Sequence, residues 1–492
     1  MAKRTSLHGL WSTRLAFILA AAGSAVGLGN IWRFPYVVGE NGGGAFFLVY
    51  LGCVLMVGLP IMMSEVMLGR RGRRSPINTM RLLSEEESGS SYWQLVGWLG
   101  VLAGFLILSF YSVVAGWSLS YMVKSMTGEF INASAGDVTR IWEGFTANWG
   151  ALLFWHTLFM GMTVFVVARG VRRGLETLVR YLMPMLVILL LVMIGYGVAQ
   201  ADFAEGASFL FRPDFSALTP EAVLIAMGQA FFTLSLGMGA IMAYGAYLPE
   251  GAHIGKTAGS VVIADTVVAI LAGLAIFPIV FGFGMDPASG PGLIFQVLPV
   301  AFGQMPGGIF FGTLFFLLLV FAAWTSSISL IEPAVAWMVE NRGFSRPAAA
   351  SLIGGTIWVL GMGTVLSFNL WSDITFLAGT VFDNIEYLTE NIMLPLGGLL
   401  IAVFAGWVMS RASSSEELGL GTGPLYKIWL FFIRFVAPLA VILAFLHATG
   451  MLGFDDDNDE QATRDAPASV VVAVAEAPME SMRTTEAYAQ RA

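Results

Sequence analysis

The sequence predicts an all-α integral membrane protein, and three observations support this. Of its 492 residues, 57% are hydrophobic and only 12% are charged, about half the charged fraction of soluble chains. Its apolar stretches reach about 20 residues or more, the length an α-helix needs to cross roughly 30 Å of hydrocarbon. Strands of a membrane barrel would alternate over about ten residues instead. We therefore expect a helical bundle and not about three soluble domains.

The apolar stretches predict eleven transmembrane helices in one membrane domain, residues 1–450. The first stretch contains Arg33 and continues past any cleavage-like site, so it is a helix and not a removable signal peptide. Residues 451–492 are acidic and rich in Ala, Thr and Pro, which predicts a disordered tail. The expected helices are 15–36, 44–68, 92–123, 149–168, 176–199, 221–247, 258–283, 307–339, 347–368, 388–409 and 428–450.

The distribution of positive charge predicts the orientation of the bundle. With a cytoplasmic N-terminus, the inner segments hold seventeen of the 25 Lys and Arg residues, as the positive-inside rule requires. An odd helix count then places the C-terminal tail outside. The single cysteine, Cys53, lies in an apolar run and says nothing about the redox compartment. The inner basic residues are Lys3, Arg4, Arg14, Arg70, Arg71, Arg73, Arg74, Arg81, Arg169, Arg172, Arg173, Arg180, Lys256, Arg342, Arg346, Arg411 and Lys427.

Glycine pairs predict breaks in the first and sixth helices. Gly27 and Gly29, like Gly237 and Gly239, stand near mid-helix, where each glycine costs about 1 kcal/mol relative to alanine. Close helix packing is the alternative explanation. The breaks are five helices apart, so residues 15–199 and 221–409 would form an inverted 5+5 repeat with 428–450 as an added helix. Corresponding broken helices in such repeats form a binding site at mid-membrane depth.

Polar residues accompany these breaks. They are Ser24, Asn30 and Arg33 in the first helix, and Gln229, Thr233 and Ser235 in the sixth. Unwound backbone frees carbonyl groups for cations and N–H groups for a carboxylate. In the eighth helix Ala322, Thr325 and Ser326 share one face, although such hydroxyls often bond back to their own helix. Asp265 in the seventh apolar run is costly in a membrane, which indicates a functional role at an ion.

Three motifs in order resemble the neurotransmitter:sodium symporters, which have the LeuT fold, and in particular their bacterial amino-acid members. They are residues 22–35 (AGSAVGLGNIWRFP) followed by 40–46 (ENGGGAF), residues 228–237 (GQAFFTLSLG), and Thr325-Ser326-Ser327. The resemblance spans residues 10 to about 450. It implies a sodium-coupled symporter that imports an amino acid by alternating access.

The resemblance implies two sodium sites. The first would use Ala25, Asn30, Thr233 and Asp265 with the substrate carboxylate, and the second Gly23, Val26, Ala322, Thr325 and Ser326. Relatives carry Asn where this chain has Asp265, and chloride-dependent relatives carry Ser where it has Ala269. A fixed carboxylate would supply the charge that chloride otherwise brings, so we expect chloride independence.

The resemblance also implies the substrate class. Monoamine transporters have Asp at the position of Gly27, so glycine here indicates an α-amino acid. Its carboxylate would meet backbone N–H groups near Gly27 and the hydroxyl of Tyr111. Met238 is adaptable and would accept a large aliphatic or aromatic side chain, although Met at helical spacing is usually packing. The expected substrate residues are Ala25, Gly27, Leu28, Gly29, Ile107, Tyr111, Phe232, Thr233, Ser235, Met238, Ser326 and Leu330.

Two gates are implied as well. Outside, Tyr111 and Phe232 resemble an aromatic lid, and Arg33 would pair with an acid on the tenth helix. Thr375 stands at the expected acid position, so Asp373, Asp383 or Glu386 would substitute, and we favour Asp383. Inside, Trp11 matches the family, while His8 replaces the usual arginine opposite Glu340, which indicates a weaker or pH-sensitive gate. Gly174 and Pro184 match a motif that lets the fifth helix unwind.

Other classes of protein fit the sequence less well. The four histidines are scattered and no HExxH or GxSxG motif occurs, which argues against a membrane enzyme. The GAHIGKT segment at 251–257 lacks the first glycine of a phosphate loop. A channel would assemble its pore from repeated subunits, whereas this chain encloses its own site. We expect amino acid, sodium and lipid as partners, no nucleic acid, a monomer or dimer, and a bacterial inner membrane.

Overall fold

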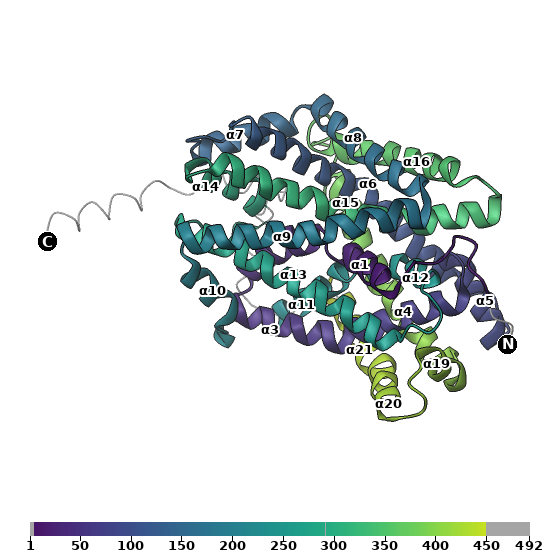
Figure 1. Cartoon of the computed structure of the whole chain (residues 1–492). Helices are drawn as coiled ribbons and strands as arrows, with labels where there is room; N and C mark the ends of the chain where they lie inside the picture. Colours follow the sequence, from purple (N-terminus) through teal and green to yellow (C-terminus); the bar gives the residue numbers. More distant parts are fainter. Residues whose placement is uncertain (1–3, 291, 449–492) are drawn as a thin grey trace, which may run out of the picture. The chain divides into compact units, whose positions relative to one another are not determined.

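Helices account for nearly all regular structure in the computed structural model, which describes residues 4–290 and 292–448 (Figure 1). The expected tail, 451–492, lies outside the described residues. The α-helices are α1 Arg14–Ala25, α2 Phe34–Glu40, α3 Gly44–Cys53, α4 Leu59–Gly72, α5 Pro76–Ser88, α6 Gln94–Met126, α7 Ala135–Thr146, α8 Trp149–Ala168, α9 Thr177–Gln200, α10 Phe203–Phe211, α11 Pro220–Thr233, α12 Ala240–Ala246, α13 Ile254–Gly282, α14 Leu298–Gln304, α15 Gly308–Arg342, α16 Arg346–Ser367, α17 Val381–Tyr387, α18 Leu394–Val403, α19 Arg411–Leu418, α20 Pro424–Phe431 and α21 Ala437–Ala448.

Nine continuous helices in the described part of the chain are long and apolar enough to cross a membrane. A tenth span is possible if α1 and Gly29–Glu40, which meet at 52°, are counted together. The chain is thus a multi-pass membrane protein. The nine are Gly44–Gly72, Gln94–Met126, Trp149–Ala168, Val171–Gln200, Ile254–Gly282, Gly308–Arg342, Arg346–Ser367, Val381–Val408 and Pro424–His447.

Both predicted breaks are present. The first helix is interrupted between Ala25, where α1 ends, and Gly29. The second interruption separates α11 from α12 and contains backbone with φ of +80° at Gly237 and +74° at Gly239, a region that favours glycine. Counting α11 and α12 as one broken span would complete the expected eleven helices. The eleven-helix count and the 5+5 repeat stay predictions.

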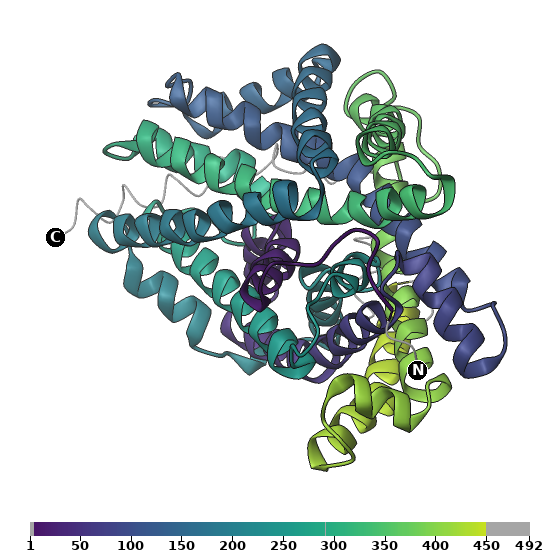
Figure 2. The same ribbon diagram turned by 45° about the vertical axis from the view of Figure 1, so that its right-hand side comes forward.

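Burial separates the inner helices from those at the edge of the bundle. The apolar windows of α6 and α15 are 78% buried, and these two helices pack along each other. The windows of α8 and α16 are 39% buried and that of Pro424–His447 only 22% buried. α1 packs against α9, α12, α13 and α15, and Figure 2 shows it enclosed by other helices. The broken helices therefore lie in the interior.

Several spans contain a π-helical turn, in which hydrogen bonds join residues five apart and one extra residue is accommodated. Such turns often occur at functional sites, and three of them adjoin the sites described below. Within residues 4–290 and 292–448 the π-helical turns are Gly29–Arg33, Val54–Gly58, Val171–Glu176, Leu293–Val297, Leu388–Met393, Phe404–Val408 and Phe432–Val436.

Candidate functional site

A fully buried carboxylate forms the centre of the first expected ion site. Asn30 Nδ2 donates a hydrogen bond of 2.9 Å to Asp265 Oδ1, and Thr233 Oγ1 donates one of 3.2 Å to the same atom. The hydroxyl of Tyr50 lies 3.5 Å from Oδ2. Ala25, the fourth expected residue, is the last residue of α1, where the helix end leaves carbonyl groups without intrahelical partners. The structure thus brings three of the four residues into direct contact.

Among the described residues, Asp265 has no basic partner. None of the ion pairs formed by residues 4–290 and 292–448 includes this carboxylate, and its hydrogen-bond partners are neutral. An ionised carboxylate buried without a cation is very unfavourable. Oxygen ligands suit hard cations. The cluster is therefore chemically suited to hold a small cation.

The residues expected for the second ion site also lie close together. Ser326 Oγ on α15 lies 3.3 Å from the carbonyl oxygen of Gly23 and 3.4 Å from that of Val26. Thr325 Oγ1 donates a hydrogen bond of 3.0 Å to the carbonyl oxygen of Ala322. This is a bond back to its own helix, as hydroxyl groups at such positions often form. A Cβ on Gly23 would lie 3.3 Å from Thr325 Cβ, so the end of α1 and this face of α15 touch. All five expected residues therefore lie together.

The break in the first helix forms a narrow space lined by hydroxyl groups. A Cβ on Gly27 would lie 2.5 Å from Ser326 Oγ and 2.9 Å from the hydroxyl oxygen of Tyr111. The N–H group of Leu28 donates to that tyrosine hydroxyl at 3.2 Å. Glycine at position 27 is thus required by close approach. The backbone N–H and the hydroxyl converge where the expected carboxylate would bind.

The two breaks lie side by side. A Cβ on Gly29 would lie 3.0 Å from the ring of Phe232, and Gln229 Nε2 donates to the Gly29 carbonyl oxygen at 2.8 Å. Ser235 Oγ donates to the carbonyl oxygen of Ser24 at 2.9 Å. These contacts join the unwound segments of the first and sixth helices into one site.

The expected side-chain pocket is buried and apolar. Ile107, Met238 and Leu330 are each at most 5% exposed. Gly104 lies on the same helix as Ile107, α6, and lets Met238 and Leu330 come close to it. A Cβ placed on Gly104 would lie 3.2 Å from the Leu330 carbonyl oxygen and 3.5 Å from that of Met238.

A buried carboxylate on α4 contacts the second break. Glu65 accepts a hydrogen bond of 2.8 Å from the Gly237 N–H group and so connects the break to α4.

On one side of this site Arg33 pairs with Glu390 in the Leu388–Met393 turn. The guanidinium also lies 4.9 Å from the centre of the Phe232 ring. The prediction that Asp383 is the partner of Arg33 was wrong. The Asp383 carboxylate accepts hydrogen bonds from the N–H and hydroxyl groups of Thr380 instead, and caps α17. The cavity beside Arg33 measures about 40 Å³, room for only a few water molecules.

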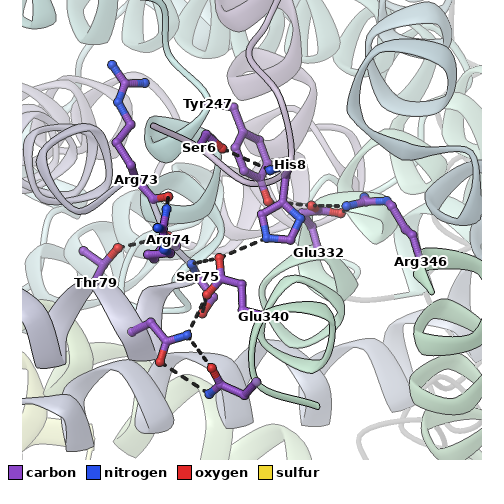
Figure 3. Close-up of polar contacts among 12 residues, drawn as sticks. Ser6, His8, Arg73, Arg74, Ser75, Thr79, Tyr247, Glu332, Glu340 and Arg346 are labelled. Atoms are coloured by element: carbon purple, nitrogen blue, oxygen red, sulfur yellow. Dashed lines mark hydrogen bonds and ion pairs between the residues drawn. The ribbon is translucent and has the colours of Figure 1, made fainter. Parts of the chain in front are cut away.

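On the opposite side His8 lies beside Glu340, with Nε2 2.9 Å from Oε1 (Figure 3). The same carboxylate accepts hydrogen bonds from the N–H group of Ser75 at 2.8 Å and from Asn78 Nδ2 at 2.7 Å. Trp11 lies nearby and donates its indole N–H to the carbonyl oxygen of Tyr244 at 3.1 Å. The expected inner pair is therefore formed, and it belongs to a wider polar network.

A second buried carboxylate extends this network. Tyr247 donates its hydroxyl to Glu332 Oε1 at 2.7 Å, and Arg346 pairs with the same carboxylate. The Tyr247 ring is 5.7 Å from the His8 imidazole, and Figure 3 shows the two side by side. The polar contacts thus connect the N-terminal segment with α12, α15 and α16.

The Val171–Gln200 span closes over the second ion site. Met183 precedes Pro184 in α9 and packs against Gly23. A Cβ placed on Gly23 would lie 3.2 Å from Met183 Sδ. Gly174 lies in the π-helical turn, where a Cβ would be only 2.1 Å from the carbonyl oxygen of Val166. Glycine is therefore required here by close approach, and in this structure the span is helical throughout Val171–Gln200.

Sequence reasoning missed several residues of the site. Glu65 and Glu332 are carboxylates within apolar runs, so the argument applied to Asp265 could have found them. Glu390 was overlooked within the expected helix 388–409. Tyr50 and Gly104 carry no signal that distinguishes them from ordinary membrane residues.

Two broken helices joined at a buried, oxygen-rich site define a secondary transporter. The comparisons with known proteins agree with this class. Residues 8–143 and 137–454 match the sodium:neurotransmitter symporter family, and the chain belongs to that family. It is therefore a sodium-dependent membrane transporter and not an enzyme.

Individual relatives show how far the similarity extends. The chain is 39% identical over 447 residues to the uncharacterized sodium-dependent transporter YhdH of Bacillus subtilis (strain 168), covering 90% of this chain and 98% of that protein. An uncharacterized sodium-dependent transporter of Haemophilus influenzae is 35% identical, with coverages of 89% and 97%. The crystal structure of MhsT in complex with L-phenylalanine is similar with a TM-score of 0.83 and 44% identity, covering 89% of this chain and 99% of that chain. The resemblance noted in the sequence is confirmed.

Proposed function

We propose that this chain imports a neutral, hydrophobic amino acid, aliphatic or aromatic, together with sodium and independently of chloride. The observation that carries the proposal is the buried Asp265, whose hydrogen-bond partners among the described residues are all neutral and include Asn30 and Thr233. A fixed negative charge there supplies the counter-charge for a cation, so no chloride is needed beside it.

The geometry at the first break supports an α-amino acid as substrate. The Leu28 N–H and the Tyr111 hydroxyl would bind its carboxylate, which would also complete the coordination of the first sodium ion. Its side chain would enter the apolar pocket of Ile107, Met238 and Leu330. The MhsT relative, solved with L-phenylalanine, agrees with a large apolar side chain.

Two sodium ions would drive this uptake. The second would bind the carbonyl groups near Gly23 and Val26 together with Thr325 and Ser326. Each charge moved through 100 mV is worth about 2.3 kcal/mol, so two ions contribute about 4–5 kcal/mol from voltage alone. That energy sustains roughly a thousandfold amino-acid gradient.

Alternating access would open one closure at a time. Arg33 and Glu390 form the outer closure with Phe232, and His8 and Glu340 form the inner one. Both are formed together here, which corresponds to an occluded state. The N-terminus would lie in the cytoplasm of a bacterial cell and the C-terminus outside, an orientation that the distribution of positive charge favours.

Uptake of radiolabelled Trp and Leu into proteoliposomes tests the proposal. Inward sodium gradients are compared with potassium gradients, and each is repeated with gluconate in place of chloride. We expect sodium-dependent uptake of at least one amino acid, unchanged in gluconate. Equal uptake in sodium and potassium would contradict the ion sites, and chloride-stimulated uptake would contradict the role of Asp265.

A further inference from the structure

Arg434 lies within a span that faces mostly outward. The span Pro424–His447 has a mean hydropathy of 2.4, and only 22% of its apolar window is buried. Arg434 occupies the Phe432–Val436 turn near its middle. A charged side chain within a membrane span is costly, and such residues normally pair with an opposite charge.

Residues 4–290 and 292–448 supply no such charge to Arg434. Arg434 Nε donates to the carbonyl oxygen of Gly406 at 2.5 Å, and the guanidinium carbon lies 5.0 Å from the centre of the Trp407 ring. No ion pair of the described residues includes Arg434. A guanidinium has five N–H donors, so four of them have no acceptor among the residues that the structure describes.

The depth of this guanidinium follows from the neighbouring span Val381–Val408. Gly397 packs against the break of the sixth helix, because a Cβ there would lie 2.5 Å from the Gly237 carbonyl oxygen. Gly406 is nine residues further along, roughly 13 Å at the rise of a helix. Half the hydrocarbon thickness is about 15 Å. The Arg434 side chain therefore extends from the middle of its span toward the headgroups, on the side of the membrane where α19 follows.

The surroundings form a site open to lipid. Trp407, Phe431 and Phe435 are exposed to between 52% and 55%, as aromatic residues at membrane interfaces are. Trp407 and Phe431 both contact the Phe435 ring. At Gly406 a Cβ would lie 3.0 Å from Arg434 Cγ, so glycine lets the arginine side chain lie close against the helix.

We propose that Arg434 binds the phosphate group of a phospholipid headgroup in the leaflet on the side of α19. A guanidinium keeps its charge and binds phosphate oxygens with two parallel hydrogen bonds. The Gly406 carbonyl and the Trp407 ring hold it toward the headgroups, and its remaining donors have no acceptor in the described part of the chain. A phospholipid phosphate supplies the missing counter-charge at this depth.

Native mass spectrometry of the detergent-purified full chain tests the proposal, with phosphatidylglycerol as probe and diacylglycerol of the same acyl chains as the phosphate-free comparison. We expect phosphatidylglycerol adducts on the unmodified protein, an at least tenfold weaker apparent affinity in Arg434→Gln, and partial retention in Arg434→Lys. Arg342→Gln is the matched control, because Arg342 also lies over a tryptophan, 6.0 Å from the Trp337 ring, but outside this site.

Three results would overturn the proposal. They are unchanged binding in Arg434→Gln, an equal loss in Arg342→Gln, and equal binding of diacylglycerol. If Arg434→Gln does not fold, Trp407→Leu is tested in its place. This variant keeps the Arg434 charge and its hydrogen bond to the Gly406 carbonyl, but removes the indole ring beside the guanidinium. Unchanged phosphatidylglycerol binding in that variant would then contradict the proposal.

Discussion

The imidazole of His8 and the carboxylate of Glu340 form a contact that is closed to solvent. Nε2 and Oε1 are 2.9 Å apart, and each side chain is only 2% exposed. Ser75 and Asn78 also donate to the carboxylate, and the Tyr247 ring faces the imidazole. Beyond Tyr247, the charges of Glu332 and Arg346 are paired with each other. A permanently charged side chain in place of His8 would therefore turn this hydrogen bond into an ion pair.

His8→Arg is expected to slow transport. A permanent positive charge at this position would strengthen the contact with Glu340, which must break to release substrate. Charge-assisted hydrogen bonds contribute about 1.5–3 kcal/mol, so sodium-driven uptake should fall roughly tenfold. His8→Gln keeps a neutral hydrogen-bond donor and should leave uptake near the level of the unmodified protein. Equal uptake by His8→Arg and His8→Gln would refute this role of the contact.

Asp265→Asn is expected to change the ion dependence of transport. The substitution keeps the shape of the side chain but removes the buried charge that would balance the first sodium ion. We expect an at least tenfold higher sodium concentration for half-maximal uptake, and stimulation by chloride. Uptake titrations with sodium chloride and sodium gluconate measure both effects.

Asp202→Asn is the control for that prediction. It makes the same chemical change at the start of α10, where Asp202 accepts the Glu205 N–H at 3.0 Å. Ion dependence should be unchanged there. If Asp265→Asn behaves like Asp202→Asn, the carboxylate at 265 does not serve the ion.

Glu390→Gln is expected to reduce uptake roughly tenfold, because it removes the counter-charge of Arg33 at the outer closure. Asp383→Asn should leave uptake near the level of the unmodified protein. It should lower the unfolding temperature instead, since its capping contacts with Thr380 contribute about 1 kcal/mol. Uptake and thermal unfolding of both variants check the assignment, and the reverse pattern would restore Asp383 as the partner.

Gly27→Ala is expected to weaken amino-acid binding at least tenfold. The added methyl group would lie 2.5 Å from Ser326 Oγ and 2.9 Å from the Tyr111 hydroxyl, so both hydroxyl groups would have to move. Gly161→Ala is the control, because open space surrounds a Cβ at that position of α8. Equilibrium binding of radiolabelled Leu or Trp measures the difference, and equal affinities in the two variants would argue against a substrate site at the first break.

The features that carry a local energetic cost could be predicted from the sequence. Glycine pairs at mid-helix indicated both breaks, and a carboxylate in an apolar run indicated Asp265. The partner of Arg33 could not be found in this way. The apolar run suggested a helix beginning at 388, whereas the structure begins α17 at Val381, so Glu390 lies within the span and not near its start.

Contacts between distant segments were also beyond the sequence. Glu65 accepts a hydrogen bond from the backbone N–H group of Gly237, and Glu332 pairs with Arg346 on the following helix. A single sequence shows that such carboxylates are costly but not which group meets them. The side chains that enclose the site were predictable by type, whereas their pairing depends on how the helices pack.

A π-helical turn holds one residue more than the regular turn it replaces, so it can absorb a change of chain length without turning the side chains that follow. Deleting one residue from the Val54–Gly58 turn would restore a regular helix and leave Glu65 facing Gly237. The same deletion in the regular helix between that turn and Glu65 would rotate the following side chains by about 100° and carry Glu65 away from Gly237. In this chain a one-residue gap should therefore be tolerated at a π-helical turn and disruptive in the regular helix beside it.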